Sequence, residues 1–403
     1  MSPGSASVED AAALEQLLSS KEVVVACGPG GVGKTTTAAA LAATAAAHIG
    51  GKVLVVTVDP ARRLADALGV TGIGNEATKV PDEAFRAAGV TPRGELHAAM
   101  LDMSESWDAL VRRHAPNAAT ARRILENPLY KNISRRFAQG HNYIAMERLY
   151  ELHEEGEYDL VVVDTPPATN ALDLLDAPSR MKEFFSSRLL RWLTVPYRSR
   201  LVNIASRPFY QVTDRILGSQ LLEDLAEFFR LLQTMQTGFV ARAEAVDRLL
   251  RDQRTTFMLV TTLEAVPAGE TGEMKAALSA RRLHLGLLVA NRVLPSSLID
   301  RTAAQAAEAL GKRSGELGES LAAALGTSDD PYVRELVSGV LSEVSRSFAD
   351  FRLVATREAE QLRELRAGHD VTVTIPYQPG AVNDLGGLLE MGARIWSEEA
   401  GER

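Results

Sequence analysis

A glycine-rich motif near the N-terminus constrains the fold of this chain more than any other feature. Residues 28–35 read Gly-Pro-Gly-Gly-Val-Gly-Lys-Thr, which fits the pattern G-x-x-x-x-G-K-[ST]. A hydrophobic run at 22–27 precedes the motif and an Ala-rich stretch follows it. This order of strand, loop and helix is the context in which the pattern forms a phosphate-binding loop.

Each position of the loop has an expected role. Glycines let backbone N–H groups close around a phosphate, and the N-terminus of the following helix favours negative charge. The ammonium group of Lys34 would reach the β- and γ-phosphates of a nucleotide, and the hydroxyl of Thr35 would ligate Mg²⁺. The backbone positions expected to contact phosphate are Gly30, Gly31, Val32 and Gly33.

Two aspartates that follow hydrophobic runs are candidates for the same site. Asp164 ends a Val-Val-Val-Asp run, where a partner of Mg²⁺ is expected at the carboxyl end of a parallel sheet. Asp59 could contact the metal and position or deprotonate a water molecule that attacks the γ-phosphate, which makes Lys34 and Asp59 the candidate catalytic residues. The alternative at both aspartates is a helix cap or turn former. Beside a phosphate loop we favour the functional role for Asp164, and at Asp59 both roles can hold at once.

Short hydrophobic runs alternate with helical patterns over most of the chain. Several runs are almost continuous Val, Ile and Leu, which is typical of strands buried on both faces of a parallel sheet. Helices between such strands imply right-handed crossovers, so we expect an α/β fold with a doubly wound, mainly parallel sheet. The expected strands are 22–27, 53–58, 158–164, 257–262, 283–290 and 371–375, with 95–102 as a further candidate.

The length of 403 residues exceeds one typical domain. Apolar residues recur at helical spacing in three stretches that are too long for simple crossovers, at about 104–140, 180–252 and 300–366. We therefore expect a single nucleotide-binding domain at 20–395 that contains these stretches as helical insertions. Residues 1–15 are expected to be disordered.

The charge balance and the cysteine count exclude several functions. Forty-four Lys and Arg against 52 Asp and Glu give a net charge of −8, which argues against a nucleic-acid partner because such a partner favours a basic excess. Cys27 is the only cysteine, so one chain cannot form a disulfide or a Cys-ligated zinc site. The sequence contains no run of about 18 apolar residues, so we expect no membrane-spanning helix. We expect a cytoplasmic protein.

Taken together, the motifs resemble those of the arsenite-pump ATPase family, which includes the cytosolic ATPase that delivers tail-anchored proteins to membranes. The match covers the loop at 28–36, the Asp-Pro-Ala-Arg-Arg-Leu-Ala-Asp segment at 59–66 and the Asp-Thr-Pro-Pro segment at 164–167, in the family's order. The resemblance implies an ATPase that binds ATP and Mg²⁺ and switches its conformation within a homodimer or heterodimer. It also implies nucleotide roles for Thr36 and, on the adenine side, for Asn291 and Pro376.

Two departures limit what the resemblance implies. The family's signature lysine, which reaches across the dimer to the partner's nucleotide, is Pro29 here, and a proline supplies neither a charge nor an N–H group. Arg62 and Arg63 are candidate substitutes, with solvated helix arginines as the alternative. The single cysteine also leaves no thiolates for an arsenite site and no Cys-x-x-Cys pair for zinc, so a dimer has to rest on packing.

Three functions are compatible with these departures. The first is an ATP-hydrolysing dimer. The second is a weakly active, nucleotide-sensing subunit of a heteromeric complex, whose other subunit is a paralogue with the signature lysine. The third is an ATP-regulated chaperone of hydrophobic helices.

The stretch at 181–232 bears on the third function. It interleaves aromatic residues such as Phe184 and Trp192 with arginines such as Arg188 and Arg191. A stretch of this kind could bind a hydrophobic client or make a peripheral contact with an anionic membrane. The alternative, which we favour, is an amphipathic helix packed on the core with its arginines in solvent.

Overall fold

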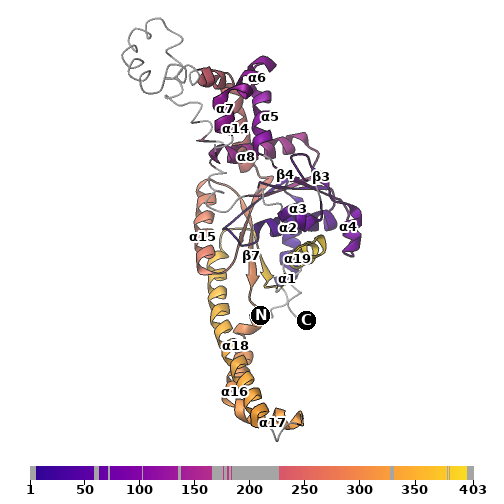
Figure 1. Cartoon of the computed structure of the whole chain (residues 1–403), viewed down its shortest axis with the longest axis vertical. Coiled ribbons are helices and arrows are strands. Elements are labelled where there is room, and N and C mark those ends of the chain that lie inside the picture. Colours follow the sequence, from indigo (N-terminus) through magenta and orange to yellow (C-terminus); the bar gives the residue numbers. More distant parts are fainter. Residues whose placement is uncertain are drawn as a thin grey trace, which may run out of the picture.

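A computed structural model shows an elongated molecule with three parts (Figure 1). An α/β body lies in the middle, a cap of short helices lies at one end, and an arm of helices extends from the other. The structure describes residues 6–58, 63–70, 73–101, 103–134, 138–165, 176, 179–180, 183, 227–326, 331–378, 380 and 382–396.

The body is built on an eight-stranded sheet with the strand order β3-β4-β2-β5-β1-β6-β7-β8. Neighbouring strands pair in parallel, except that β3 is antiparallel to β4. The predicted α/β fold and every predicted strand are confirmed. Strand β3 was not predicted, because two residues are too few to show an alternation of apolar and polar side chains. The strands are β1 Val23–Cys27, β2 Lys52–Thr57, β3 Thr78–Lys79, β4 Glu95–Met100, β5 Leu160–Asp164, β6 Thr255–Thr261, β7 Leu285–Val293 and β8 Val371–Pro376.

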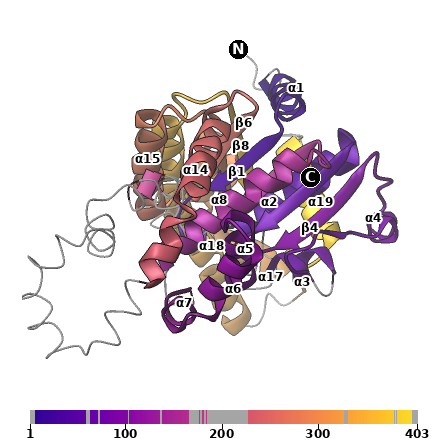
Figure 2. The same cartoon turned by 90° about the horizontal axis from the view of Figure 1, so that it is seen from above.

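Each face of the sheet has its own hydrophobic core, because successive strand residues point to opposite sides. Along β1, Val24 and Ala26 belong to one cluster, whereas Val23 and Val25 belong to the other. Helices therefore cover both faces and leave the carboxyl ends of the strands at one edge (Figure 2). The first face is covered by α1 Ala6–Ser19, α2 Lys34–His48 and α19 Leu385–Trp396, and the second by α8 Ala138–Glu155, α14 Gln236–Arg251 and α15 Ala265–Ala280.

Helix α2 is buried along almost its whole length, since its alanines let neighbouring elements approach closely. Helix α19 packs against it so tightly that a Cβ at Gly392 would overlap Thr44. This packing fixes the N-terminus of α2 directly behind the glycine-rich motif. Two further short helices pack on the first face, α3 Arg63–Leu68 against α2 and α4 Asp82–Ala87 against α19.

Helix α1 corrects the expectation of a disordered segment at 1–15. The helix begins at Ala6. Its leucines recur at helical spacing, and Leu14, Leu17 and Leu18 are buried against the first face of the sheet. Burial of these three leucines stabilises a helix that the polar composition of the segment did not suggest.

The cap lies in the first expected helical insertion. It consists of α5 Met103–His114, α6 Ala118–Glu126 and α7 Pro128–Ser134. These helices share a small core with the start of α14, including Phe239. Arg242 of α14 donates hydrogen bonds to Glu147 at 2.7 Å and to Glu154 at 2.6 Å, both on α8, and so ties the second insertion to the body.

The arm lies in the third expected insertion. A short 3₁₀ helix, η3 Ser296–Ile299, leads from β7 into α16 Arg301–Lys312, α17 Ser314–Ala324 and α18 Pro331–Leu365. The 35 residues of α18 span about 52 Å, and the helix returns the chain to β8. None of the helices in the described part of the chain is long and apolar enough to cross a membrane. The division into one domain with insertions stays a prediction.

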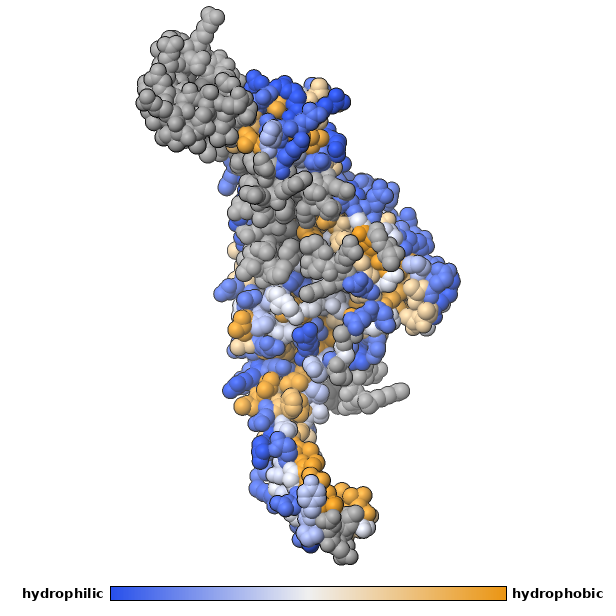
Figure 3. All heavy atoms as spheres, in the orientation of Figure 1, coloured by the Kyte–Doolittle hydropathy of each residue, from blue (hydrophilic) through white to orange (hydrophobic). Residues whose placement is uncertain are grey.

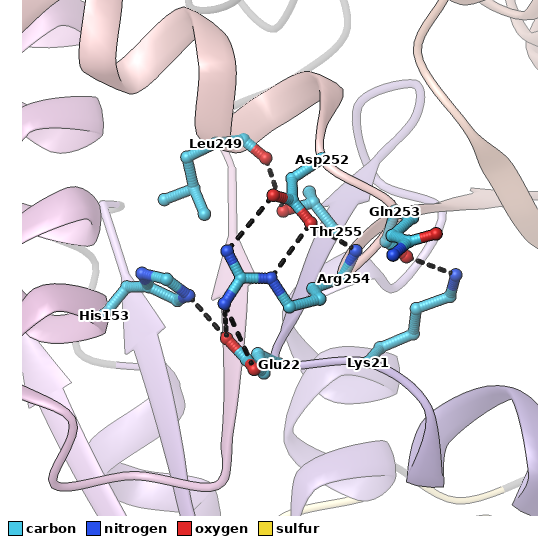
Figure 4. Close-up of polar contacts among 8 residues, drawn as sticks. All are labelled: Lys21, Glu22, His153, Leu249, Asp252, Gln253, Arg254 and Thr255. Atoms are coloured by element: carbon cyan, nitrogen blue, oxygen red, sulfur yellow. Dashed lines mark hydrogen bonds and ion pairs between the residues drawn. The ribbon is translucent and has the colours of Figure 1, made fainter.

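A polar network joins the amino ends of β1 and β6, at the edge opposite the glycine-rich motif (Figure 4). Glu22 accepts a hydrogen bond of 3.1 Å from Arg254 and lies 2.7 Å from Nε2 of His153. Arg254 also donates to Asp252, with 3.0 Å between Nε and Oδ1. The Arg254 side chain and then its backbone N–H lower the pKa of Asp252 from its ordinary value of 3.8 to about 2.

We expect this network to lose its contribution to stability in acid. A carboxyl group with a lowered folded pKa stabilises the fold above its unfolded pKa, and this contribution is lost as the pH falls through the folded pKa. For Asp252 the window runs from about pH 4 to about pH 2. The Tm of Asp252→Asn should fall less steeply across that window than the Tm of the unaltered chain. We expect a difference of only about a few degrees, because about a third of the Asp252 side chain is exposed and solvent screens its charge. Parallel curves would contradict this role of Asp252.

Candidate nucleotide-binding site

The loop between β1 and α2 lies at the carboxyl edge of the sheet, where β1 is flanked by β5 and β6. Gly28 and Gly33 have positive φ angles of 146° and 93°, which L side chains rarely adopt. A Cβ at Gly28 would overlap the carbonyl group of Val260, and a Cβ at Gly33 would overlap the side chain of Asn291. The loop can therefore form only with glycine at these positions.

Lys34, the first residue of α2, directs its ammonium group into the loop. Only 7% of the residue is exposed, and its Nζ donates a hydrogen bond of 2.7 Å to the carbonyl oxygen of Pro29. A buried ammonium group beside a helix N-terminus attracts anions strongly, because little water screens it. A phosphate bound in the loop would compete with the Pro29 carbonyl for this group.

Thr35 and Asp164 meet at the end of the loop. The hydroxyl of Thr35 donates to Oδ2 of Asp164 at 2.7 Å, and the hydroxyl of Thr57 donates to the same oxygen at 2.9 Å. The strand register explains this meeting, since Asp164 pairs with Thr57 on one side and with Ala26 on the other. Asp164 is 1% exposed. The structure thus brings together two of the three residues that the sequence assigned to the metal, Thr35 and Asp164, and adds Thr57.

The oxygen ligands fit Mg²⁺. When the Thr35 hydroxyl donates its proton to Asp164, its lone pairs face away from the carboxylate and are free for a hard cation. Among the described residues no three His, Cys, Asp or Glu side chains form a metal-binding group. Mg²⁺ is commonly held by one or two protein oxygens together with nucleotide phosphates. Thr35, with Asp164 behind it, would hold the cation in this way.

Asn291 connects β7 to the loop. Its side chain is buried, its Nδ2 donates to the carbonyl oxygen of Val32 at 2.8 Å, and its Oδ1 accepts from the backbone N–H of Arg292 at 2.9 Å. Pro376 lies at the end of the neighbouring strand, where it pairs with Val293. The two residues implied for the adenine side thus lie on adjoining strands, and Asn291 is the one that contacts the loop. Their contact with adenine stays a prediction.

Cys27 is a core residue at the end of β1. It is fully buried, and burial raises the pKa of its thiol to about 12, so that the thiol is protonated and unreactive near neutral pH. Thr165, directly after Asp164, donates to the carbonyl oxygen of Ala26 at 2.6 Å. This bond anchors the start of the segment at 164–167 to β1. Thr165 was noted from the sequence only as part of the segment at 164–167. Thr57 was not singled out, although it is a polar residue at the end of a hydrophobic run.

Several predicted residues lie outside the described part of the chain. They include Asp59, Arg62 and most of the 181–232 stretch, and the side chain of Arg63 is also outside it. Their expected roles in water activation, charge compensation and partner binding stay predictions.

A glycine-rich loop between a parallel strand and a helix, a buried lysine and a Thr–Asp pair define a phosphate-loop nucleotide-binding protein. The chain belongs to the anion-transporting ATPase family, whose model matches residues 21–320. This confirms the resemblance drawn from the motifs.

Similar proteins occur in bacteria and in fungi. An uncharacterised protein of Streptomyces coelicolor is 30% identical over 272 residues, which cover 66% of this chain and 61% of that protein. ATPase BagA of Mycobacterium tuberculosis is 31% identical over 156 residues, 38% of this chain and 43% of BagA. ATPase get3 of Schizosaccharomyces pombe is 25% identical over 289 residues, 70% of this chain and 77% of get3. The chain thus spans less than two thirds of the first two relatives.

Proposed function

We propose that this chain binds Mg·ATP in the loop at 28–35 and hydrolyses it to ADP and phosphate. The observation that carries the proposal is the placement of the buried Lys34 ammonium beside the Thr35–Asp164 pair, at the N-terminus of α2. Family membership supports the same activity, since the relatives with assigned functions are named ATPases. The cytoplasmic location expected from the sequence is part of this proposal.

Each group at the site has its own role in binding and hydrolysing ATP. Backbone N–H groups of the loop and the ammonium group of Lys34 bind the phosphates and offset the charge that develops on them. Thr35, with Asp164 behind it, would hold Mg²⁺, which would supply further positive charge at the phosphates. Asp59, after β2, orients the attacking water and accepts its proton. Thr57 keeps the Asp164 carboxylate facing Thr35.

Phosphate release by the purified chain, measured together with its mass under native conditions, tests the proposal. We expect Mg²⁺-dependent release that EDTA abolishes, from a dimer in the presence of ATP. Absence of both ATP binding and phosphate release from the chain, alone and with a co-expressed paralogue, would refute it.

A second function, a nucleotide-sensing subunit of a heteromeric complex, is favoured by Pro29. In the described loop Pro29 contributes only its carbonyl group, which accepts from Lys34, and no cation that could reach a partner's nucleotide. On this proposal the partner is a paralogue with the signature lysine. Turnover would then be slow in the homomer, because a cation supplied in trans is worth about 10³-fold or more in phosphoryl transfer.

Pro29→Lys distinguishes the two functions. If the missing cation limits the homomer, this variant should raise kcat at least about tenfold, because the new ammonium group can reach the partner's nucleotide. Pro29→Ala is the matched control, since it removes the ring, keeps the carbonyl group and adds no charge. Fast turnover in the unaltered homomer, with no gain from Pro29→Lys, would exclude the sensing function.

A further inference from the structure

Strand β7 changes its alternation just before it ends. Val289 belongs to the first core of the sheet and Ala290 to the second, so regular alternation would return Val293 to the first core. Val293 packs on the second core instead. The pairing with β8 explains the change, since Ala290 pairs with Thr374 and Val293 with Pro376. Strand β7 therefore has one residue more than β8 over this step, which is a β-bulge.

The bulge turns the chain at Arg292 and aims Asn291 at the glycine-rich loop. Arg292 has a positive φ angle of 59°, which a residue with a side chain rarely adopts and keeps only where its surroundings hold it. Its backbone N–H donates to Oδ1 of Asn291, whose Nδ2 donates to the carbonyl oxygen of Val32. Bulges beside functional sites often re-aim a side chain in this way. The position of Asn291 on the loop thus depends on the bulge.

Glu358 of α18 holds the far end of the bulge. Its Oε2 accepts a hydrogen bond of 2.9 Å from the backbone N–H of Leu294, the residue after β7. A second hydrogen bond, from the backbone N–H of Tyr377 to the carbonyl oxygen of Val293, is also 2.9 Å long and joins the bulge to β8. A carboxylate is a stronger acceptor than a neutral carbonyl group. The arm helix thus contributes a strong contact to the bulge.

Packing alone does not explain a carboxyl group at this position. Glu358 shares one helix face with Leu362 and Leu365, four and seven residues further on, which pack on the second core. Only 9% of Glu358 is exposed. Hydrophilic residues lie over the surface of the arm (Figure 3), and every other acidic residue of α18 is exposed. A buried carboxyl group is costly unless it is hydrogen-bonded, so an apolar side chain would suit the packing better.

The surroundings of Glu358 make its hydrogen bond more significant. Burial raises the pKa of the Glu358 carboxyl above its ordinary value of 4.5, and the N–H of Leu294 opposes this rise. The charge of Glu264, which directly precedes α15, raises the pKa further. Burial and a like charge thus both act against the ionised carboxyl group, and the bond to Leu294 favours it. The same bond fixes the end of the bulge.

We propose that Glu358 is a positioning residue for the nucleotide site, which holds the bulge at the end of β7 and thereby the Asn291 side chain on the glycine-rich loop. The connection runs from Glu358 through the N–H of Leu294 and the turn at Arg292 to Asn291. Because Glu358 belongs to α18, the arm is coupled to the affinity for ATP. That effect on ATP rests on the proposed function, whereas the effect on the loop does not require ATP.

Hydrogen–deuterium exchange without nucleotide tests the connection in the full chain. Glu358→Ala should speed exchange of the backbone amides at 28–37 and 291–294 by about tenfold, because the bulge loses a hydrogen bond and Asn291 loses its place on the loop. Strand β5, 160–164, is the internal reference, since its exchange changes only if the whole fold is weakened. Glu360→Ala, an exposed glutamate on the same helix, is the matched control and should leave exchange unchanged at both places.

Glu358→Leu separates positioning from fold stability. Leucine suits the buried position and should keep the Tm, but it cannot accept the N–H of Leu294. Exchange at 28–37 should therefore rise in this variant as well. Unchanged exchange at 28–37 in both variants, or an equal rise at 28–37 and in β5, would overturn the proposal.

The affinity for Mg·ATP provides a second measurement. Glu358→Ala should raise the Kd about tenfold with little change in kcat, because the phosphate contacts of the loop remain in place. Glu358→Gln keeps a side-chain acceptor for the N–H of Leu294 and should bind ATP almost as tightly as the unaltered chain. In a chain that carries Asn291→Ala, Glu358→Ala should cause no further loss, since both changes act through one contact.

The two measurements fail in different ways. Additive losses of affinity in the double variant would show that Glu358 does not act through Asn291, and would overturn the proposal. Absence of ATP binding in the unaltered chain, together with the expected exchange at 28–37, would refute the ATPase function and leave the connection from Glu358 to the loop supported.

Discussion

Lys34→Ala is expected to lower kcat/KM for ATP hydrolysis by at least about a thousandfold, or about 4 kcal/mol of transition-state stabilisation. The reason is the burial of the ammonium group inside the loop, 2.7 Å from the Pro29 carbonyl oxygen, where its attraction for phosphate is weakly screened. The measurement is steady-state phosphate release at saturating Mg²⁺, with circular dichroism to verify the fold.

Lys52→Ala is the matched control for this change. Lys52 begins β2 at the amino edge of the same sheet and is exposed, so the same substitution removes a charge far from the loop. The control should keep full activity. Full activity in Lys34→Ala as well would mean that the loop is not the catalytic site.

Asp164→Asn is expected to lower kcat by about a hundredfold to a thousandfold and to raise the Mg²⁺ concentration needed for half-maximal rate. The change removes a buried negative charge and replaces one carboxylate oxygen with an amide NH₂ group, which cannot accept the Thr35 and Thr57 hydroxyl protons. Thr35 would then turn, and its lone pairs would no longer face the cation. Titration of phosphate release against Mg²⁺ measures both effects.

Two variants of Thr57 separate positioning from fold stability. Thr57→Ser keeps the hydroxyl that donates to Asp164 and should keep near-normal Mg²⁺ dependence. Thr57→Val removes the hydrogen bond to Asp164 and should shift the Mg²⁺ dependence in the same direction as Asp164→Asn, by about tenfold. An unchanged Mg²⁺ profile in Asp164→Asn would show that Asp164 is a structural residue.

The sheet and the loop were predictable because their physical causes are local. Valine runs such as 161–163 are buried on both faces, and the motif at 28–35 requires glycine at positions that the structure holds at positive φ. The meeting of Thr35 with Asp164 also followed, since the carboxyl ends of neighbouring parallel strands share one edge.

Other features depend on long-range packing and were not predictable. The register between β2 and β5 brings Thr57 to Asp164, and no local pattern shows that register. Asn291 was implied for adenine by resemblance, whereas its observed contact with Val32 arises where β7 passes the loop. Helix α1 was missed because its stability comes from leucines that pack on a distant part of the chain. The place of Glu358 beside the end of β7 likewise depends on how α18 packs on the body.

The binding of Mg·ATP in the loop at 28–35 is tested most directly by calorimetric titration of ATP into the purified chain. We predict one ATP per chain, bound at least about tenfold more tightly with Mg²⁺ than with EDTA, and no detectable binding to Lys34→Ala. Equal binding to the unaltered chain and to Lys34→Ala, or no binding to a folded chain at millimolar Mg·ATP, would contradict the account.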